Sequence, residues 1–398
     1  MNSEGASRTY HMTDESPPDP RRKIELLIVT GAVGFERDGI IYLPSEQVER
    51  FRALPQQFDT TLVIKRGVAR EGTTTPLPAG IRVAWIEPYA SKWHLLTPQH
   101  FLALWPAVRD ARSVITLMPL LDGIAPLVLA LVARRPRYVY VIANSIHFRS
   151  PVRGGHVVRL VARVLLNACA VISNRVFVHG IGLAQELWEP VRRKTTEIII
   201  STISEQDFMP AERDESRRLE VLCVSRLVPA KHVDVAVEMT RILLDRGVDA
   251  RLTVVGRGPL RDDLTDRARS LSLGDRVVFT GFIDDRQQLR DLYRRSHVFV
   301  LPTEMEGISL AIQEAMAAGL PVVSTHAGAL AEFLRHGIDS IVVEGADPAA
   351  FADAVGQLAA SRDLRLEIGR AGQQKVARLG NAAWVDAVAD LVQADLRG

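Results

Sequence analysis

Two glutamates in the second half of the chain, Glu306 and Glu314, have a spacing that could serve a ligand. They are eight positions apart and follow the apolar run HVFVLP. On a helix, eight positions are a little over two turns, so the two carboxylates would lie near one face, about 12 Å apart. That separation is too long for a shared proton and suits the two ends of one extended ligand. An ordinary amphipathic helix with solvated glutamates is the alternative.

The residues directly after Glu306 are expected to begin that helix. They are Gly307, Ile308 and Ser309. The first backbone N–H groups of a helix have no partner inside the helix, and the helix dipole is positive at that end. The segment therefore predicts a place where a diphosphate or a sugar hydroxyl could be held.

Two cations, Arg226 and Lys231, lie near the start of the second half. Arg226 follows the apolar run VLCVS, and Lys231 begins a helical pattern five residues later. At the end of a strand, such a pair could neutralise a leaving diphosphate. Taken alone, they are more often surface charges. Gly256 and Gly258 in VVGRGPL predict a strand-to-helix turn, without a full dinucleotide fingerprint or a Walker sequence.

These residues need secondary-structure elements that position them. Apolar runs of about five to seven residues alternate with helical patterns along most of the chain. Strands of this kind predict parallel sheets covered by helices on both faces, a doubly wound α/β fold with a ligand crevice between two domains. The predicted divisions are a disordered polar tail over 1–22, a first α/β domain over 23–203, a second α/β domain over 204–380 and a helix over 381–398 that crosses back to the first domain.

Composition restricts the class of protein. The chain has 398 residues, of which 47% are hydrophobic and 24% charged, so it can bury substantial cores. Its two cysteines, Cys169 and Cys223, lie in apolar runs, which argues against a disulfide framework and favours a reducing compartment. The amino-terminal tail has no apolar signal region, and Pro, Gly and Asp interrupt the longest apolar stretch, so no membrane span is predicted.

The first half of the chain is basic. Residues 1–200 contain 25 Lys/Arg and 17 Asp/Glu, a formal charge of +8, and the remainder has a charge of −6. Arg153, Arg159 and Arg163 recur at helical spacing, and the apolar residues beside them are Val157, Leu160, Val161 and Val164. Such a helix could rest on anionic lipid or attract a phosphorylated acceptor. A helix with this apolar side in the core is the plainer interpretation.

Five ordered motifs resemble the carboxy-terminal half of the family-4 retaining glycosyltransferases of the GT-B fold (glycosyl transferases group 1). The motifs are SRLVPAKH (225–232), VVGRGPLRDDL (254–264), VVFTGFIDD (277–285), LPTEMEGISLAIQEAMAAGLPVVST (301–325) and AGALAEFL (327–334). The resemblance covers about residues 219–360, and the first half is similar to the family only in its rhythm of strands and helices. It implies two Rossmann-like domains that face each other across a crevice.

The resemblance assigns roles to the charged residues. The matching arginine and lysine of the family neutralise the leaving diphosphate, which implies catalytic and donor-binding roles for Arg226 and Lys231. Glu314 would accept hydrogen bonds from the ribose hydroxyls. Glu306 would orient the transferred sugar or stabilise a cationic, oxocarbenium-like centre.

The resemblance also places the nucleotide. The turn at Gly256 would lie beside it, and the backbone around Phe282 and Ile283 would lie near the base. A buried strand edge explains these two apolar residues equally well. The sequence departs from many family members at Gly328 and Ala329, where two glycines are common.

Two features of the first half match the family less specifically. His147, in a loop after the run YVYVIA, would contact the donor sugar, and a structural or solvated histidine is the alternative. A loop is expected over Thr30 to Gly39, where Gly31 and Gly34 could let the backbone approach a phosphate or the acceptor. An ordinary turn is the alternative there, because the double glycine of the family is absent.

The implied function is a metal-independent retaining hexosyltransferase that moves a sugar from a nucleoside diphosphate donor to an unidentified acceptor. UDP is favoured over GDP and ADP, no cofactor is expected, and no D-x-D metal motif occurs. The acceptor would be a small molecule, a glycan or a lipid-linked molecule, nucleic acid is not expected, and the location would be cytoplasmic or peripheral at the inner membrane face. A nucleotide-sugar 2-epimerase and a non-catalytic nucleotide-sugar-binding protein are the rival functions.

Overall fold

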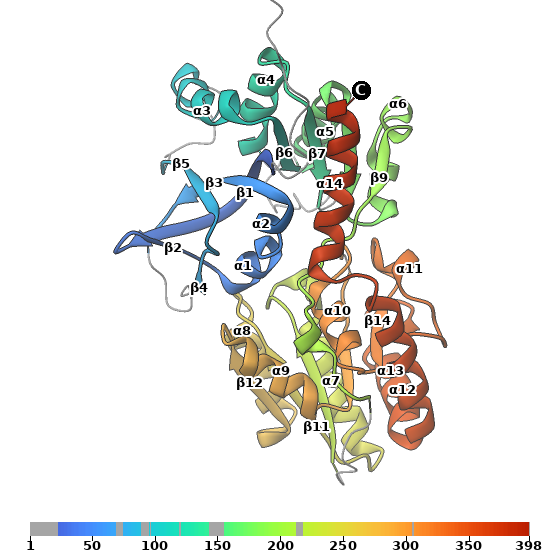
Figure 1. Cartoon of the computed structure of the whole chain (residues 1–398). Coiled ribbons are helices and arrows are strands. Elements are labelled where there is room, and N and C mark those ends of the chain that lie inside the picture. Colours follow the sequence, from blue (N-terminus) through green and yellow to red (C-terminus); the bar gives the residue numbers. More distant parts are fainter. Residues whose placement is uncertain are drawn as a thin grey trace, which may run out of the picture.

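The computed structural model describes residues 23–68, 75–88, 95, 97–118, 121–142, 155–211, 218–304 and 306–397. These residues form two α/β domains, one above the other in Figure 1, each built on a sheet with helices packed against it.

The amino-terminal domain has seven parallel strands in the order β5-β3-β1-β6-β7-β8-β9. They are β1 Ile24–Arg37, β3 Phe58–Arg66, β5 Ile81–Ile86, β6 Ser113–Met118, β7 Arg137–Val141, β8 Arg175–Val178 and β9 Thr195–Glu197. Two short strands, β2 Ile40–Leu43 and β4 Thr75–Pro76, extend the sheet in antiparallel pairing. The helices are α1 Ser45–Phe51, α2 Leu54–Gln57, α3 Pro98–Asp110, α4 Ile124–Val132, α5 Gly155–Ile172 and α6 Glu189–Arg192.

The carboxy-terminal domain has six strands, all parallel, in the order β12-β11-β10-β13-β14-β15. They are β10 Leu219–Val224, β11 Ala250–Val255, β12 Val277–Gly281, β13 Val298–Leu301, β14 Val322–Thr325 and β15 Ile341–Val343. The helices are α7 Val233–Asp245, α8 Arg261–Ser270, α9 Arg286–Arg295, α10 Leu310–Ala317, α11 Leu330–Phe333, α12 Pro348–Ala360 and α13 Arg362–Val376. The doubly wound α/β fold class is confirmed.

The apolar runs form strands because both faces of each sheet are covered. In β1, Leu26 and Ile28 join the core beneath α1 and α2, whereas Leu27 and Val29 join the core beneath α3 and α4. Successive side chains of a strand point to opposite faces, so a continuous apolar run satisfies both cores.

The last helix, α14 Asn381–Arg397, packs on the amino-terminal domain, although the carboxy-terminal domain precedes it in the chain (Figure 1, red). Trp384, Val385 and Val388 are buried in the same core as β1, β3 and β7. Its polar side is tied to that domain by the Arg175–Asp395 ion pair at 2.7 Å. The helix therefore fastens the two domains together.

The loop expected over Thr30 to Gly39 is not formed, and that prediction is wrong. Strand β1 continues to Arg37, with a register irregularity against β3 between Val29 and Val33. The chain turns only at Asp38 and Gly39, both with positive φ, because that dipeptide suits a two-residue hairpin. Gly34 packs against β2, where an added Cβ would approach the Leu43 side chain within 2.7 Å.

Candidate active site

A cavity of about 700 Å³ lies between the two domains, and residues of both domains line it. The amino-terminal domain contributes Ser45, Gln47, Arg50, Ile142, His179, Ile200 and Thr202. The predicted site residues in its lining are Arg226, Lys231, Gly256, Phe282, Ile283, Glu306, Gly307, Ile308, Ser309 and Glu314. Residues from four separate motifs of the second half therefore meet in one place.

Two predicted site residues are not in that lining, and the structure does not describe a third. Gly31 and Gly34 lie within β1 and are not among the residues that border the cavity. His147 lies outside the described residues, so its role stays a prediction.

The segment that carries the two glutamates is part loop and part helix. Helix α10 begins at Leu310, with Ser309 as its N-cap, which is three residues later than the sequence suggests. Glu306 therefore precedes the helix, and the helical estimate of 12 Å does not apply to it. No side chain caps the start of α10, and Ile308 and Ser309 line the cavity. The backbone N–H groups of this first turn are thus placed at the cavity wall.

Lys231 and Glu306 form an ion pair across two loops of the carboxy-terminal domain. Lys231 ends a short 3-10 turn, is only 6% exposed, and lies 3.5 Å from the Thr303 hydroxyl. Arg226 follows β10 and is exposed at the rim. Among the described residues, no carboxylate pairs with Arg226. The pair is neutral as a whole, so Arg226 is the cation best placed to meet an incoming anion.

Glu314 lies in a buried network that the sequence did not indicate. Its Oε1 accepts a hydrogen bond from Arg286 at 2.5 Å, and its Oε2 accepts one from the Tyr293 hydroxyl at 3.0 Å. The Thr202 hydroxyl, from the other side of the domain boundary, lies 3.5 Å from Oε1. A carboxylate has about four acceptor positions, so this arrangement orients Glu314 and leaves capacity for a ligand hydroxyl.

The charges within this network shift the pKa values of its members. Burial alone would lower the pKa of the Arg286 guanidinium, but the carboxylates of Glu314 and Asp207 reverse this and raise it. Burial would raise the pKa of Asp207, but hydrogen bonds from Arg290 and Ser204 outweigh it and lower that pKa. Burial also raises the pKa of Tyr293, with the Glu314 charge adding to the effect. The Asp207 carboxylate thus stays ionised, and the Tyr293 hydroxyl stays a donor.

His179 is a site residue that the sequence reasoning missed. It follows β8, and its Nε2 lies 3.0 Å from the backbone carbonyl of Ile308 in the other domain. Its Nδ1 accepts a hydrogen bond from the Ile200 N–H at 3.1 Å, so Nε2 carries the proton and donates to Ile308. Burial lowers its pKa to about 4, so it is neutral at pH 7. Its place at the end of the apolar run RVFV was a signal that could have found it.

Close backbone packing explains the glycine pair after β11. An added Cβ on Gly256, which has φ +145°, would come within 1.8 Å of the Ser225 carbonyl oxygen, and one on Gly258 within 2.1 Å of that of Leu227. Only glycine permits this approach. The two glycines therefore support the loop that presents Arg226 to the cavity.

Apolar and cationic side chains together form one end of the cavity. The Arg257 guanidinium lies 4.8 Å from the centre of the Phe282 ring, and Phe282 is 39% exposed. Beside them, the Ser45 N–H at the start of α1 lies 3.4 Å from the Asp284 carboxylate, so the amino-terminal domain closes over this end. A flat aromatic group could stack here.

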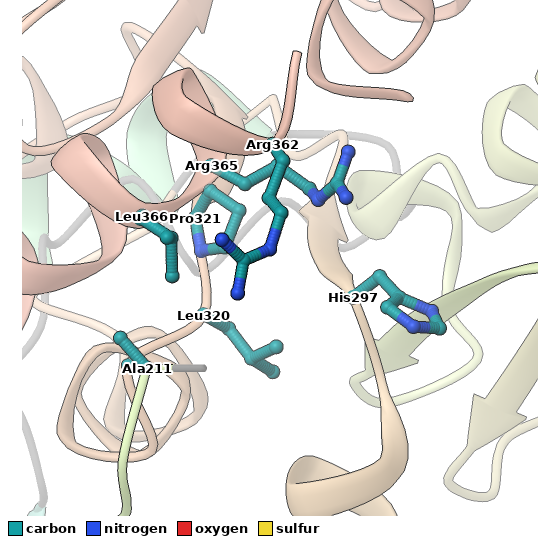
Figure 2. A pocket seen from close by; sticks show the side chains of 8 residues that line it. Ala211, His297, Leu320, Pro321, Arg362, Arg365 and Leu366 are labelled. Carbon is teal, nitrogen blue, oxygen red and sulfur yellow. The ribbon is translucent and has the colours of Figure 1, made fainter. Parts of the chain in front are cut away.

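A second, much smaller hollow lies at the base of the carboxy-terminal domain. Figure 2 shows it bordered by Ala211, His297 and Pro321, with the arginines of α13 beside them. It has about 20 Å³, which is room for roughly one water molecule. It cannot hold a substrate, so the cavity between the domains is the candidate active site.

The comparisons with known proteins agree with this geometry. Residues 218–361 match the protein-family model "Glycosyl transferases group 1". The second domain is therefore similar to this family of glycosyltransferases. The match covers most of that domain and contains every carboxy-terminal site residue discussed above.

Two curated relatives illustrate the likeness. The chain is 33% identical over 181 residues to the GDP-mannose-dependent alpha-(1-6)-phosphatidylinositol monomannoside mannosyltransferase of Mycobacterium tuberculosis. The aligned residues make up 42% of this chain and 47% of the relative. It is 34% identical over 175 residues to the D-inositol 3-phosphate glycosyltransferase of Actinosynnema mirum, and this alignment covers 40% of this chain and 42% of the relative. The chain thus spans about half the length of the curated relatives it matches.

Solved structures identify the fold as GT-B. The sucrose-phosphate synthase of Thermosynechococcus elongatus has a TM-score of 0.71 at 18% identity, with 94% of this chain and all of that chain covered. Anabaena HepE, in a complex with UDP and glucose, has a TM-score of 0.69 at 15% identity, with 93% and 99% covered. The predicted GT-B architecture of the two facing domains is confirmed.

The described part of the chain has neither a metal-binding cluster nor a membrane-spanning helix. No group of three or more His, Cys, Asp or Glu residues there is arranged to hold a metal ion. No helix among those residues has the length and apolar character needed to cross a bilayer.

Proposed function

We propose that this protein is a retaining glycosyltransferase that moves a hexosyl unit from a nucleoside diphosphate sugar to an acceptor. One observation carries the proposal: Arg226, Lys231, Glu306 and Glu314 line a single cavity between two Rossmann-like domains. Two cations and two carboxylates in one crevice match the charges of an activated sugar, whose diphosphate is anionic and whose sugar becomes cationic on transfer.

The diphosphate would lie between Arg226 and the start of α10. The guanidinium of Arg226 and the free N–H groups after Ser309 both stabilise phosphate oxygens. Lys231 would share its charge between Glu306 and the leaving group. These cations perform the electrostatic work that a divalent metal performs elsewhere, which supports transfer without a metal.

The nucleoside would occupy the end of the cavity formed by α9 and α10. Glu314, held by Arg286 and Tyr293, would accept hydrogen bonds from the ribose hydroxyls, and the base would stack near Phe282. We favour UDP as the carrier. The mycobacterial relative named for GDP-mannose makes GDP the alternative to test.

Retention at the anomeric carbon follows if the acceptor attacks from the face that the diphosphate leaves. The bond from C1 to the phosphate oxygen breaks, a bond from C1 to the acceptor oxygen forms, and the acceptor proton passes to the departing phosphate oxygen. Glu306 would stabilise the positive charge that develops on the sugar. The amino-terminal domain would shape the acceptor site, and closure of the crevice would exclude water from the donor.

The experiment is a thermal-shift titration of the whole chain with UDP, GDP, ADP and their sugars, followed by activity with the sugar of the best nucleotide. We expect UDP to raise the melting temperature most. Glu314→Gln should weaken nucleotide binding at least about tenfold, because it replaces a carboxylate acceptor by an amide. Glu306→Gln should leave nucleotide binding within about twofold and lower turnover at least about 100-fold. Glu304→Gln, at a half-exposed side chain of the same loop, is the matched control.

Several results would reject the proposal or part of it. The transfer function fails if none of the nucleotides binds, or if Glu314→Gln binds them as the wild type does. Inverted stereochemistry of the product, observed by NMR, would reject retention alone. A stronger response to GDP than to UDP would change only the assignment of the base.

A further inference from the structure

One side of α5 exposes apolar residues to solvent. Leu160 is 63% exposed, Val161 51% and Val171 51%. The full set also includes Val164, Leu165 and Ala168, so exposed apolar positions recur every three or four residues along the helix. Positions with this spacing form one continuous stripe. We call these six residues the α5 stripe.

The stripe is separate from the side of α5 that packs in the core. Leu166, Cys169 and Ala170 are buried against β7 and β8. The interpretation that Leu160, Val161 and Val164 belong to the core is therefore wrong, because other residues of α5 form the side of the helix that faces the core. An apolar stripe of this length on a protein surface indicates a contact with something apolar.

An exposed tryptophan lies beside α5. The backbone N–H of Trp188 donates to the Asn167 side chain of α5 at 2.7 Å, and the Trp188 side chain is 43% exposed. Tryptophan is favoured at membrane–water interfaces, because its ring is apolar and its N–H is polar. Its position predicts that it would lie at the level of the lipid headgroups.

The part of the sequence that contains α5 is strongly basic. Residues 131–200 contain eleven Lys/Arg and three Asp/Glu. Lys194 donates to the Val171 carbonyl at 2.9 Å, which places a cation at the carboxy-terminal end of the stripe. A polar hollow of about 380 Å³ lies beside that end. Arg193 and Lys194 line it, together with the Arg175–Asp395 ion pair. Cations thus border an apolar surface.

We propose that the α5 stripe docks this protein on the surface of an anionic lipid bilayer. An apolar helix face bordered by cations and tryptophan is the arrangement that binds anionic membranes, since the apolar groups enter the interface while the cations meet the headgroup phosphates. A second copy of the chain is a poorer partner, because two identical basic rims would repel each other.

The docked helix would also bring the crevice close to the membrane. Helix α5 joins the end of β7 to the start of β8, and these strands are parallel. The helix must therefore run away from the edge where Ile142 and His179 line the cavity. Given the proposed transfer function, an acceptor anchored in lipid would lie near the amino-terminal side of that cavity.

Sedimentation of the whole chain with vesicles tests the docking. Vesicles of phosphatidylcholine alone are compared with vesicles that contain about 30% phosphatidylglycerol, at low and at high salt. We expect binding to the anionic vesicles, weakened by salt, and at least about tenfold weaker binding of the double variant Leu160→Glu and Val164→Glu. Ile338→Glu, a change at a 57% exposed apolar residue of the other domain, should bind as the wild type does.

The possible outcomes separate docking from its alternatives. Circular dichroism and the melting temperature of each variant establish that it is folded. Unchanged binding of the double variant, or equal binding to neutral and anionic vesicles, would overturn the proposal. Light scattering separates docking from self-association. If the wild type is dimeric and does not bind vesicles, and the double variant is monomeric, the stripe is an interface with a second copy of the chain. Vesicle binding requires neither donor nor acceptor, so its failure would leave the proposed transfer intact.

Discussion

His179 controls how the two domains meet at the active site. Its Nε2 donates to the Ile308 carbonyl at 3.0 Å, directly before the start of α10. The histidine therefore acts as a positioning residue for the loop between Glu306 and α10, and it holds this loop against the amino-terminal domain.

The lowered pKa of His179 predicts a pH dependence of stability. The folded protein keeps this histidine neutral down to about pH 4, whereas the unfolded chain binds a proton near pH 6.5. The unfolded state therefore gains protons first, and stability falls as the pH drops from 6.5 towards 4, by about 3 kcal/mol in total. Chemical denaturation at pH 5 and pH 7 measures the effect.

His179→Gln provides the comparison for that experiment. Glutamine keeps a donor for Ile308 and has no group that titrates in this range, so the difference between pH 5 and pH 7 should shrink. His336→Gln, at an exposed histidine, should keep the wild-type difference. If His179→Gln loses as much stability as the wild type between the two pH values, another group is responsible.

At the residue scale, the sequence predicts the charged residues but not their partners. Arg226, Lys231, Glu306 and Glu314 stand in motifs whose order indicates their proximity. Arg286 and His179 stand outside the five motifs, and their roles depend on contacts with residues far away in the chain. Of the two, only His179 has a signal in the sequence, its place at the end of the apolar run RVFV. Partners of this kind become visible only once the two domains are placed.

At the scale of elements, the turn after β11 supports the loop that carries Arg226. We predict that Gly256→Ala destabilises the protein by at least about 2 kcal/mol more than Gly247→Ala. Both glycines have positive φ, but an added Cβ clashes with Ser225 at the first and meets nothing within 4 Å at the second. Gly247→Ala therefore measures the conformational cost alone.

Two measurements check this difference. Thermal denaturation compares the stabilities of the two variants, and nucleotide titration tests whether displacement of the Ser225 backbone weakens binding at Arg226. Equal stabilities would show that the turn can relax without cost.

Most elements follow from the apolar runs, and the exceptions have identifiable causes. The prediction of a loop after Thr30 gave weight to Gly31 and Gly34, but pairing with β2 and β3 extends the strand through both. The sequence pattern predicts that α10 starts at Gly307, whereas Gly307 and Ile308 form a bend and the helix begins only after the N-cap Ser309. Tertiary pairing outweighs local propensity in the first case, and helix ends vary by a few residues in the second.

At the scale of the whole molecule, α14 makes the amino-terminal core depend on the end of the described chain. We predict that Trp384→Ala destabilises the amino-terminal domain by about 3–5 kcal/mol, because Trp384 is 5% exposed in that core. Hydrogen exchange should rise in β7 and β8 and stay unchanged in β10 and β13. Asp390→Ala, at an exposed position of the same helix, is the control. Equal acceleration in both sheets would mean that the domains unfold as one unit.

The path of α14 has a consequence for biosynthesis. A ribosome makes the strands of the first sheet early, but the side chains that seal one of its faces belong to residues 384–392. While the second domain is still being translated, only α1 and α2 cover that apolar face, and the part that α14 covers stays exposed. The first domain to be synthesised is thus the last to be completed, and during that interval chaperones have an exposed surface to bind.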